Sequence, residues 1–335
     1  MSGVVLRVPL SMRGKVEASP WRRAGGLGTN ENLFEQLKKI APVRRDEPLA
    51  RHVTFGIGGP ADLFVTVRST DELARAVITT RDAGVPLFIL GAGSNILVGD
   101  GGIRGVVINN QAKHIEGPSG RSGEWLLRAE SGVAFATLSR HLAKDGYGGI
   151  EWACGIPGSL GGAAVYNAGA YGGCLADVLR SVTMLLANGS QREVPAADLR
   201  LTYRNSVFTL GECAGCVVLA LLLAVTPGDP AALLRRIEEI DEQRLGAQPR
   251  GRNGGSTFKN PEGQQAWELI GAVGLRGHRI GGAQISEQHC NFFVNTGAAR
   301  AADVYALMQE ARRRVKERFD IELEREIELV GEGFA

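Results

Sequence analysis

The chain has 335 residues, which exceeds one ordinary domain and predicts two or three packed units around a large apolar core. Lysine and arginine number 38 against 36 aspartates and glutamates, so the formal net charge is only +2. This balance gives no general electrostatic reason to bind nucleic acid or a membrane surface, and we expect neither partner. The sequence does not determine the oligomeric state, and a monomer is the expectation.

Glycine is the residue type used to excess, with 46 copies gathered in a few stretches. Glycine lets the main chain adopt positive φ angles and approach a bound molecule closely, at a cost in conformational entropy. The glycine-rich stretches are therefore where we look for function.

The five cysteines, Cys154, Cys174, Cys213, Cys216 and Cys290, are odd in number and irregularly spaced. A chain of this size does not depend on disulfides, so we predict that all five are reduced thiols. Cys213 and Cys216 form a C-x-x-C pair, but no second pair and no matching histidines follow it. We therefore predict no zinc site and no other metal.

The sequence gives no sign of export or membrane insertion. The longest apolar run, residues 216–225, has about half the length that a membrane-spanning helix needs, and Pro227 follows it. Residues 1–32 mix arginines with glycines and lack a sustained apolar core, so they do not resemble a secretory signal. We expect a cytoplasmic protein.

Hydrophobic periodicity and turn residues divide the chain into five parts. Residues 1–35 are predicted to form a flexible N-terminal extension. Residues 36–115 are predicted to form a first α/β subdomain. Its expected elements are strands at 61–67, 87–90 and 105–109 and a helix at 71–83 capped by Ser69 or Thr70.

Residues 116–228 are predicted to form a second subdomain that becomes rich in strands toward its end. The pair Asn188 and Gly189 is typical of a hairpin turn. The expected elements are a strand at 125–129, a helix at 134–145, a glycine-rich stretch at 155–173 and strands at 182–186 and 216–225.

A boundary is predicted just before Asp229, which is suited to cap a helix that runs to about Arg244. Residues 229–320 are predicted to form a smaller domain that ends in a helix at 301–319. The apolar stripe of that last helix is typical of a core face. Residues 321–335 form a C-terminal segment.

The segment Leu-Gly-Ala-Gly-Ser-Asn at 90–95 follows a predicted strand directly. Its glycines would let main-chain N–H groups approach a pyrophosphate, so the loop is a candidate phosphate cradle. It is not the G-x-G-x-x-G of a Rossmann dinucleotide site, because Ile96 stands where the third glycine is required. Taken alone, the segment is explained equally well by a tight structural turn.

A second glycine-dense stretch covers residues 155–173. It begins with Gly-Ile-Pro-Gly-Ser-Leu-Gly-Gly and ends with Asn-Ala-Gly-Ala-Tyr-Gly-Gly. Each glycine adds to the entropy lost on folding, so stability does not explain this density. Two such loops in one chain indicate one large ligand that carries phosphate.

Together with Thr-Phe-Gly-Ile-Gly-Gly-Pro-Ala-Asp at 54–62, the two loops resemble the FAD-binding half of the UDP-N-acetylenolpyruvoylglucosamine reductase family. The resemblance spans about residues 36–331. It implies an α+β protein with the vanillyl-alcohol-oxidase-type FAD-binding fold, in which two α/β subdomains hold FAD without a covalent bond and a smaller α+β domain binds substrate. The residues that it assigns to FAD are Ile57, Gly58, Gly91, Ala92, Gly93, Ser94, Asn95, Gly155, Ile156, Pro157, Gly158, Ser159, Gly162, Asn167, Gly169 and Ala170.

Three further stretches match the same family and are more specific than the glycine loops. They are Tyr-Arg-Asn-Ser at 203–206, Gly-Ser-Thr-Phe-Lys-Asn-Pro at 255–261 and Leu-Glu-Arg-Glu-Ile at 323–327. By this resemblance the catalytic residues are Arg204, Ser256 and Glu326. The Gln-Pro pair at 248–249 resembles the branch of the family with the shorter substrate domain.

The resemblance also implies an activity. The protein is expected to reduce UDP-N-acetylglucosamine enolpyruvate to UDP-N-acetylmuramate in peptidoglycan precursor synthesis, with NADPH as the reductant of FAD. Because both NADPH and the sugar must present a carbon to the same flavin, we expect ping-pong kinetics. The residues assigned to substrate binding are Tyr203, Gln248, Lys259, Asn260, Gln284 and His289.

The chemistry of such a reduction needs side chains of these types. Hydride addition to the methylene carbon of the electron-poor alkene places negative charge on the adjacent carboxylate, where a fixed cation such as Arg204 lowers the barrier. A proton must then reach the neighbouring carbon, and Ser256 is a candidate donor if Lys259 or ordered water offsets the developing alkoxide. Glu326 in its protonated form would hydrogen-bond the substrate carboxylate.

Each catalytic candidate also has an ordinary explanation. Arg204 could form a salt bridge, Ser256 could belong to a turn, and Glu326 could be one acid in an acidic segment. Three motifs in the order of the family outweigh these separate explanations.

Two other functions stay open. A flavin-dependent oxidase of a related fold would oxidise an alcohol or an amine, and such enzymes often tether the flavin through a histidine or cysteine, which residues 91–102 lack. A carrier that binds flavin or a sugar nucleotide without turnover would have no use for the three catalytic candidates.

Two places depart from the commoner pattern of the family. Tyr166 stands where many relatives carry methionine, and Arg250 and Arg252 make the segment before the serine motif more basic than usual. Our hypothesis is that the two arginines favour a diphosphate or the phosphate of NADPH.

Overall fold

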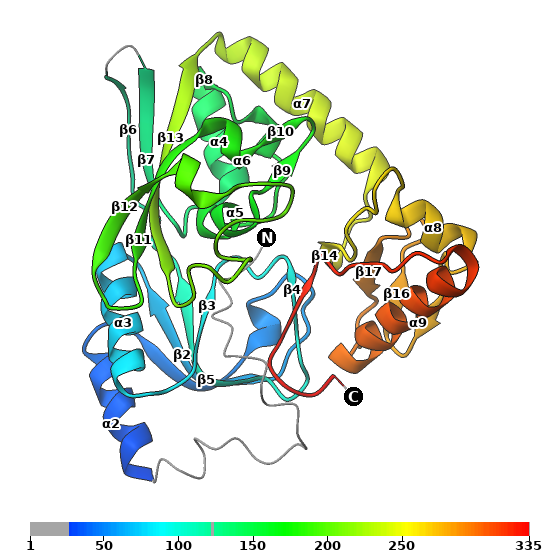
Figure 1. Cartoon of the computed structure of the whole chain (residues 1–335), viewed down its shortest axis with the longest axis horizontal. Coiled ribbons are helices and arrows are strands. Elements are labelled where there is room, and N and C mark those ends of the chain that lie inside the picture. Colours follow the sequence, from blue (N-terminus) through cyan, green and yellow to red (C-terminus); the bar gives the residue numbers. More distant parts are fainter. Residues whose placement is uncertain (1–26, 122–123, 335) are drawn as a thin grey trace. The chain divides into compact units, whose positions relative to one another are not determined.

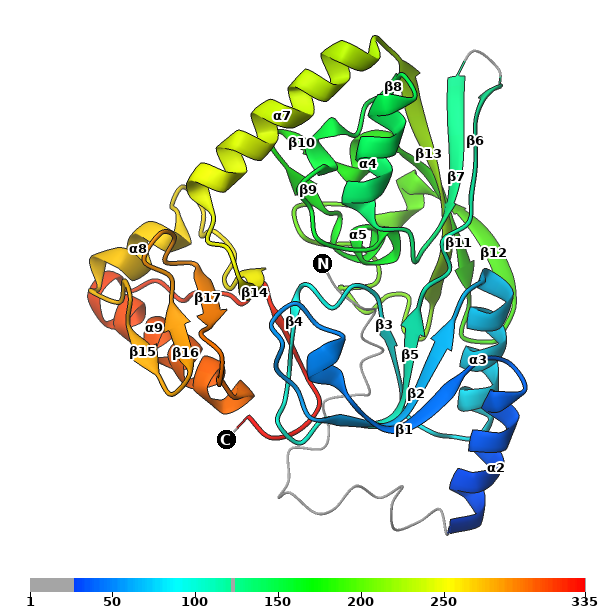
Figure 2. The ribbon, with the colours of Figure 1, turned by 180° about the vertical axis from the view of Figure 1, so that it is seen from behind.

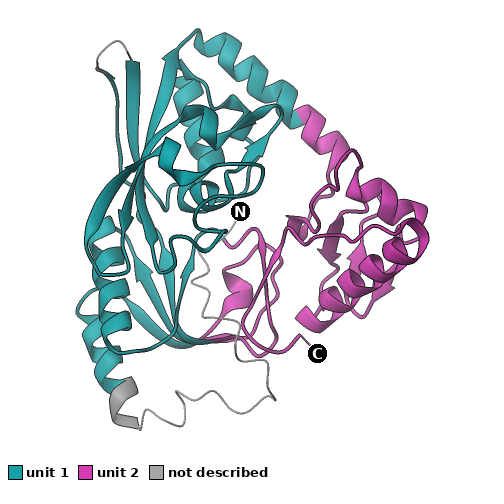
Figure 3. Ribbon diagram, in the orientation of Figure 1, with its two compact units in different colours: residues 1–46, 62–92, 104–241 teal, residues 47–61, 93–103, 242–335 magenta. Residues whose placement is uncertain are grey.

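The computed structural model describes residues 27–121 and 124–334 and mixes helices with strands, so the protein is α+β as predicted (Figure 1). The described chain forms two compact units (Figure 3). Unit 1 takes the described residues up to Asp46 with 62–92 and 104–241, and unit 2 takes 47–61, 93–103 and 242–334. In the structure, the short segments 47–61 and 93–103 belong to the same compact unit as the C-terminal part of the chain. The division of the sequence into five consecutive parts stays a prediction.

The smaller sheet of unit 1 has the strand order β1-β2-β5-β3, and β3 pairs with β5 in parallel. Helices α2 (Leu27–Lys38) and α3 (Thr70–Asp82) lie on one side of it (Figure 2). The Ser69 hydroxyl caps α3 by accepting the Glu72 N–H at 3.2 Å, as expected of an N-cap serine. The strands are β1 (Val43–Pro48), β2 (Pro60–Val67), β5 (Ile103–Asn110) and β3 (Leu87–Leu90).

Helix α2 corrects the prediction of a flexible extension over residues 1–35, because it occupies part of that stretch. Leu33 and Leu37 are buried in the apolar core of unit 1, and this burial holds the helix. The rest of the predicted extension, residues 1–26, lies outside the described residues.

The larger sheet of unit 1 has the order β12-β11-β13-β7-β6, with β8 also paired to β13. Strand β13 runs through its centre and is almost wholly buried, which explains its continuous apolar sequence. The predicted hairpin is present, and Leu185 pairs with Gln191 across its turn. The strands are β6 (Ile115–Arg121), β7 (Glu124–Glu130), β8 (Tyr147–Gly148), β11 (Leu179–Leu185), β12 (Gln191–Pro195) and β13 (Val217–Pro227).

Short helices lie on one side of this larger sheet (Figure 1). They connect the sheet to the second glycine-rich stretch, which contributes the paired strands β9 and β10. These elements are α4 (Phe135–Lys144), η2 (Glu151–Ala153), α5 (Leu160–Tyr166), β9 (Gly169–Ala170), β10 (Gly173–Cys174), α6 (Leu175–Val178) and η3 (Ala196–Leu199).

Helix α7 (Pro230–Ala247) begins where the sequence predicts it. The Asp229 carboxylate accepts hydrogen bonds from the N–H groups of Ala231 and Ala232, both at 3.2 Å, so the predicted N-cap is confirmed. Ile237 and Ile240 are its buried residues and pack in a small apolar cluster with unit 1.

Unit 2 contains a four-stranded sheet in the order β14-β17-β16-β15 and a parallel pair of β18 and β4. Helix α9 (Ala301–Phe319) has the predicted bounds, and its apolar stripe lies in the core of this unit. The other elements are η1 (Leu49–Arg51), β4 (Ile96–Val98), β14 (Arg252–Ser256), α8 (Ala266–Ala272), β15 (Arg279–Ile280), β16 (Ala283–Ile285), β17 (Phe292–Asn295) and β18 (Glu328–Val330).

Candidate active site

The first glycine loop follows the end of β3, begins with Gly91 and Ala92 and leads into β4. Gly93 has a φ of +62°, and a Cβ added there would lie 2.6 Å from the carbonyl oxygen of His52. Glycine is therefore required at this position for both its backbone angle and the close approach of a second main-chain segment. Ser94 and Asn95, which follow it, are buried.

The 54–62 motif packs against the same loop. The Thr54 N–H donates to the carbonyl oxygen of Gly93 at 3.1 Å. Gly58 has a φ of +146°, and a Cβ added there would lie 2.7 Å from the Cβ of Val98. Ile57 beside it is buried. The glycines of this motif thus bring two loops of unit 2 into contact along their main chains.

The C-terminal segment joins the first glycine loop to the serine motif. The Asn95 side-chain amide donates to the main-chain oxygen of Glu326 at 3.0 Å, and the Glu328 N–H donates back to the main-chain oxygen of Asn95 at 3.0 Å. The Glu326 N–H donates to the carbonyl oxygen of Thr257 at 2.9 Å. Since Thr257 follows Ser256 directly, the structure brings Ser256 and Glu326, far apart in sequence, into one region of unit 2.

Two predicted substrate residues of the serine motif have protein partners. The Lys259 ammonium forms an ion pair with the Glu324 carboxylate at 2.5 Å. The Asn260 amide accepts from the Ala266 N–H at 3.0 Å and donates to Gln265 at 2.9 Å, so it holds the start of α8. Their contact with substrate stays a prediction.

The other predicted substrate residues of unit 2 lie in less exposed surroundings. Gln284 is buried, accepts from Arg279 at 3.0 Å and donates to the carbonyl oxygen of Gly277 at 3.2 Å. The His289 ring packs between Trp267 and Phe292, with ring centroids 5.8 and 4.9 Å away. Burial lowers the pKa of His289 from its usual value. A main-chain hydrogen bond partly offsets this effect by raising the pKa, and the positive charge of the nearby Arg276 lowers it. Gln248 follows the end of α7.

The second glycine loop ends in a capped helix of unit 1. The Ser159 hydroxyl accepts from the Gly162 N–H at 3.4 Å at the start of α5. Asn167 ends α5 in the left-handed conformation, and its amide donates to the carbonyl oxygen of Thr202 at 3.0 Å. The remaining predicted cofactor residues of this loop lie just before or just after α5, and they are Gly155, Ile156, Pro157, Gly158, Gly169 and Ala170. Among them Ile156 is buried and Pro157 is exposed.

Arg204 lies at the tip of a tight turn in unit 1. Thr202 and Asn205 exchange main-chain hydrogen bonds at 3.1 and 3.2 Å, which leaves Tyr203 and Arg204 as the two central residues. Arg204 has a φ of +55°, an angle that a non-glycine residue adopts only under such constraint. Its guanidinium donates to the carbonyl oxygen of Gly169 at 3.2 Å, in the second glycine loop. Tyr203 is 61% exposed, so its ring is accessible to a ligand.

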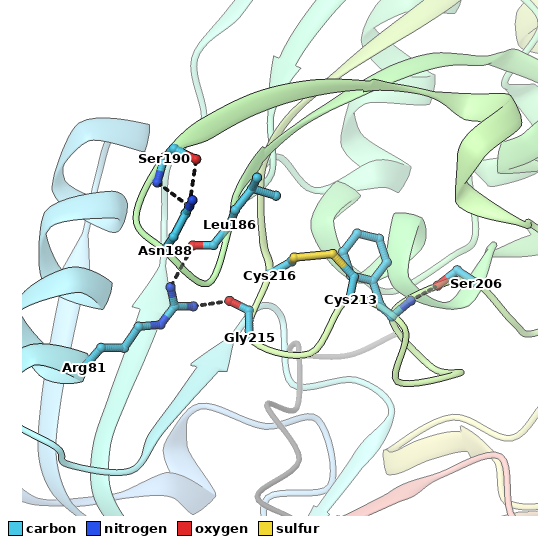
Figure 4. The surroundings of a disulfide bond; sticks show 9 residues. Arg81, Leu186, Asn188, Ser190, Ser206, Cys213, Gly215 and Cys216 are labelled. Atoms are coloured by element: carbon cyan, nitrogen blue, oxygen red, sulfur yellow. Dashed lines mark hydrogen bonds between the residues drawn. A yellow bond between two sulfur atoms is a disulfide. The ribbon is translucent and has the colours of Figure 1, made fainter.

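The turn that follows Arg204 contains a disulfide (Figure 4). Cys213 and Cys216 are bonded, so the prediction of five reduced thiols is wrong for this pair. The compact turn brings their Cα atoms to 5.5 Å, which lies within the range that a disulfide bridges. Cys154, Cys174 and Cys290 form no disulfide and are reduced thiols, as predicted.

Neither a metal site nor a membrane span is found in the part of the chain that the structure describes. Its histidines, cysteines and acids form no cluster of three that could hold a metal ion. Its helices include none that is both long and apolar enough to cross a membrane.

The two places that depart from the family pattern are both structured. Tyr166 is buried at the end of α5. The side chain of Arg252 packs over Gly56, where an added Cβ would lie 2.8 Å from its Cδ. The arginine therefore covers a glycine of the 54–62 motif. Its role toward a phosphate stays a hypothesis.

Sequence reasoning missed two residues that organise unit 2. The Thr54 hydroxyl donates to the carbonyl oxygen of Asn253 at 2.7 Å and so ties the 54–62 motif to the strand before Ser256. Asn291 is buried and bonds to the main chain of the serine motif. A single threonine or asparagine leaves no periodic pattern in the sequence. Thr54 could have been suspected because it belongs to a glycine motif, whereas Asn291 stands in no such motif.

The residues predicted to bind FAD fit that group by their chemistry. FAD offers a pyrophosphate, hydroxyls and ring heteroatoms, which call for main-chain N–H groups and neutral polar side chains. Ser94, Asn95, Ser159 and Asn167 are buried polar side chains beside the two glycine loops. Asn95, Ser159 and Asn167 bond to the main chain and so fix both loops, whose glycine-rich main chain suits a polar phosphate-bearing ligand.

Comparison with known proteins agrees with this arrangement. Residues 61–195 match a family described as an FAD binding domain, and residues 247–330 match the C-terminal domain of UDP-N-acetylenolpyruvoylglucosamine reductase. A reductase of that name from Lachnoclostridium phytofermentans is 40% identical over 309 residues, covering 90% of this chain and 98% of the relative. Its namesake from Rubrobacter xylanophilus is 42% identical over 305 residues, covering 91% of this chain and 99% of the relative.

A solved structure extends the likeness to the fold. The crystal structure of UDP-N-acetylenolpyruvylglucosamine reductase from Thermus caldophilus superposes with a TM-score of 0.72 at 34% identity, covering 87% of this chain and 99% of that one. The predicted FAD-binding fold is thereby confirmed, and the protein is an FAD-dependent oxidoreductase. On its sequence, its fold and its glycine loops, the chain belongs to the UDP-N-acetylenolpyruvoylglucosamine reductase family.

Proposed function

We propose that this protein uses NADPH, through FAD, to reduce UDP-N-acetylglucosamine enolpyruvate to UDP-N-acetylmuramate in peptidoglycan precursor synthesis. The observation that carries the proposal is the 2.9 Å hydrogen bond from the Glu326 N–H to the carbonyl oxygen of Thr257, which brings the predicted acid beside Ser256. The shared name of the relatives supports the choice of substrate. A monomeric state and a cytoplasmic location remain part of the prediction.

The two glycine loops would hold the cofactor. Main-chain N–H groups of residues 91–95 and of the non-proline residues at 155–159 would bind its pyrophosphate, and the buried Asn95 and Ser159 would position its polar groups. When bound, FAD supplies the hydride that it has taken from NADPH.

Arg204 would stabilise the charge that develops on the substrate. Once a hydride has reached the methylene carbon, negative charge moves onto the adjacent carboxylate. A guanidinium presents several donors in a fixed plane, which matches the two oxygens of a carboxylate. Its bond to Gly169 at 3.2 Å and the strained turn limit its freedom, so little reorganisation is needed when the charge forms.

Ser256 would donate the proton that completes the reduction. The hydroxyl proton passes to the carbon that bears the carboxylate, and the serine recovers a proton from solvent after product leaves. Lys259 is three residues beyond Ser256, and its ammonium forms an ion pair with the Glu324 carboxylate at 2.5 Å. The positive charge of Lys259 would offset the transient alkoxide on Ser256. Glu326 would hydrogen-bond the substrate carboxylate in its protonated form.

Two half-reactions followed by visible absorption test this proposal. The purified protein is mixed anaerobically with NADPH and then with UDP-N-acetylglucosamine enolpyruvate. The flavin bands should bleach in the first step and return in the second. A flavin that stays reduced in the presence of the sugar would exclude this substrate. In a separate aerobic assay, rapid oxygen consumption with a simple alcohol and none with NADPH would favour an oxidase. A folded protein that does not bind FAD would overturn the proposal.

A further inference from the structure

Asn291 bonds to the main chain on the C-terminal side of Ser256. It is 2% exposed, and its side chain makes two hydrogen bonds to Phe258: the N–H donates to Oδ1 at 2.9 Å, and Nδ2 donates to the carbonyl oxygen at 2.8 Å. The main-chain oxygen of Asn291 also accepts the Thr257 N–H at 2.8 Å. One residue therefore makes three hydrogen bonds to the two residues that follow Ser256.

These bonds continue a sheet that is irregular at this point. Strands β14 and β17 lose their regular register between Asn253 and Ser256, and Ser256 opposite Phe292 is the last pair. Beyond that pair one main-chain bond remains, from the Thr257 N–H to the Asn291 carbonyl oxygen at 2.8 Å, and at Phe258 the Asn291 side-chain amide continues the pattern by imitating a peptide group. Without that side chain, Phe258 would lose both of these hydrogen bonds, and on this side only the main-chain bond of Thr257 would remain.

The other side of the segment is held by the predicted acid. The Thr257 carbonyl oxygen accepts the Glu326 N–H at 2.9 Å, and the Lys259 N–H donates to the carbonyl oxygen of Glu324 at 2.8 Å. The 257–259 segment thus lies between Asn291 and the C-terminal segment. Phe258, wholly buried against Phe293 at 6.0 Å between ring centroids, fixes its depth in the core.

Asn291 itself is oriented by a neighbour. Its N–H donates to Nδ1 of His289 at 3.3 Å, which requires a lone pair on that nitrogen. The partly buried, aromatic surroundings of His289 favour the neutral ring that supplies this lone pair. The contacts therefore form a chain from His289 through Asn291 to the serine motif.

We propose that Asn291 is a positioning residue for Ser256. It does not need to touch the substrate: it fixes the main chain after the serine, so that the hydroxyl keeps the one direction from which a proton reaches the substrate carbon. This inference rests on the proposed function, because it assigns Asn291 to the proton-transfer step alone.

The test separates the two half-reactions in Asn291→Ala. Flavin reduction by NADPH should stay within about twofold of the wild type, because that step needs no proton from Ser256. Reoxidation by the enolpyruvyl sugar should slow by about 10²-fold, the size expected for a misplaced catalytic group. The solvent deuterium isotope effect on reoxidation should rise as proton transfer becomes limiting. Asn32→Ala, which truncates an exposed asparagine of α2 outside the serine motif and both glycine loops, is the control, and both rates should stay near wild type.

A double-mutant cycle with Ser256→Ala decides the assignment. If Asn291 acts through Ser256, the double variant should reoxidise no more slowly than Ser256→Ala alone. Additive losses, or equal slowing of both half-reactions, would show a merely structural role and overturn the inference. Should Asn291→Ala fail to fold, Asn291→Asp keeps the acceptor for the Phe258 N–H and takes its place in the cycle. A wild type that bleaches but is not reoxidised would instead refute the proposed function.

The disulfide in unit 1 carries a second, independent inference. It closes the turn that continues from Arg204, and the Cys213 N–H donates to the carbonyl oxygen of Val207 at 3.2 Å. Val207 is three residues beyond Arg204, and its N–H donates to the carbonyl oxygen of Leu199 at 3.0 Å, before the arginine turn. The covalent link therefore supports the base of the loop that presents Arg204.

The two ends of the disulfide are held unequally (Figure 4). Cys216 is buried beside the first residue of β13, and the carbonyl oxygen of Gly215 accepts a hydrogen bond from the Arg81 guanidinium. The same guanidinium donates to the carbonyl oxygen of Leu186 at 3.1 Å. Cys213 is only half-buried, in a turn with exposed neighbours. If the bond opens, the Cys213 end is the one free to move.

We infer that Cys213 and Cys216 form a thiol–disulfide exchange site that tunes the Arg204 loop. A small dithiol would attack the more accessible sulfur: the Sγ–Sγ bond breaks, the two cysteines gain two electrons and two protons, and the reductant leaves as its own disulfide. Opening this link would loosen the base of the arginine turn and slow only the step that needs Arg204.

Comparing the oxidised protein with protein reduced by dithiothreitol and freed of reductant tests this site. Mass spectrometry after alkylation should count two more thiols in the reduced form, and reoxidation by the sugar should slow by about threefold to tenfold. The Cys213→Ser/Cys216→Ser variant should show the slower rate regardless of reductant, and Cys174→Ser should behave as wild type. An unchanged thiol count, or equal rates in both forms, would overturn the inference.

Discussion

The side-chain amide of Asn95 donates to the main-chain oxygen of Glu326 at 3.0 Å, which ties the first glycine loop to the predicted catalytic acid. Replacing Asn95 with alanine leaves that partly buried carbonyl without this donor, so the free energy of unfolding should fall by about 0.5–1.5 kcal/mol. Flavin binding and reoxidation by substrate should weaken together, because one side chain serves both segments. Urea unfolding and a flavin titration measure the two effects, and Asn32→Ala, an exposed asparagine of α2, should change neither.

Arg204→Lys should separate charge from geometry. Lysine keeps the positive charge but not the planar set of donors, so reoxidation of the flavin by substrate should slow by about 10²-fold, as when one fixed donor to a developing anion is lost. Reduction by NADPH should be unchanged. Stopped-flow absorption measures both rates. A lysine variant as fast as the wild type would remove Arg204 from the predicted role.

Ser256→Ala should be slowed at the proton-transfer step. Loss of a positioned proton donor typically costs about 10²–10⁴-fold, so reoxidation should slow by that factor while NADPH still bleaches the flavin. Ser256→Cys, which retains an acidic hydrogen at nearly the same place, should recover part of the rate. Equal rates in the serine and alanine proteins would mean that another group supplies the proton.

Asp100 should stabilise α9 as a cap contributed from a distant part of the chain. Its carboxylate accepts from the Ala301 N–H at 2.8 Å and the Ala302 N–H at 3.2 Å. Asp100→Ala should therefore lower the free energy of unfolding by about 0.5–2 kcal/mol, and Asp100→Asn should lose less because it keeps one acceptor. Chemical unfolding of the three proteins gives the ranking. A stability of the alanine variant equal to that of the wild type would contradict the capping role.

The stabilising effect of Glu310 should disappear in acid. Hydrogen bonds from Arg313 and then from Arg314 lower the pKa of its carboxyl from 4.5 to about 2. Because the folded pKa lies below the unfolded one, the ion pairs stabilise the fold fully above about pH 4.5, and the contribution is lost as the pH falls toward 2. These side chains are largely solvated, so Glu310→Gln should cost only about 0.5–1 kcal/mol at pH 7.

The measurement for Glu310 is a pair of unfolding curves at pH 7 and near pH 3. The gap between the wild type and Glu310→Gln should shrink at the lower pH. An exposed acid of α7, changed in Glu238→Gln, serves as the control and should show no such trend. A gap that grows in acid would reverse the assigned sign.

Local signals predicted those elements whose ends are chemically marked. Asp229 and the residues after it combine a cap with an apolar stripe, and α7 begins where this combination places it. The 301–319 helix has a long stripe of period 3.6, which leaves little choice of bounds. In each helix the residues that give the signal lie close together in the sequence, so the helix can be predicted without knowledge of distant contacts.

Tertiary contacts decided the elements that the sequence did not predict. Helix α5 contains Gly161 and Gly162, which disfavour a helix in isolation, yet a Cβ added at Gly161 would lie 3.0 Å from the Cβ of Ser131. Tight packing of α5 against Ser131 leaves no room for a side chain at Gly161, and this packing stabilises the helix despite its glycines. Helix α2 is likewise held by burial of Leu33 and Leu37, with no strong periodic signal of its own.

The candidate site was only partly accessible to sequence reasoning. Arg204, Ser256 and Glu326 stood out through family resemblance, since each alone has an ordinary explanation. Asn291 could not stand out, because its function depends on an irregularity in the pairing of β14 and β17 that no local pattern announces. The disulfide was excluded by an argument from chain size, which does not foresee a turn that brings two cysteines together.

The pairing of β4 with β18 has a consequence for synthesis of the chain. Asn95 and Glu326 are 231 positions apart, so the first glycine loop leaves the ribosome long before the strand that completes it. Closing so long a loop is entropically costly and slow, and the partner strand is made only after the intervening chain has been synthesised. A nascent chain arrested after β13 would carry both glycine loops but hold the first one unsupported. We therefore expect tight flavin uptake to wait until β18 has been made, rather than to begin when the first glycine loop appears.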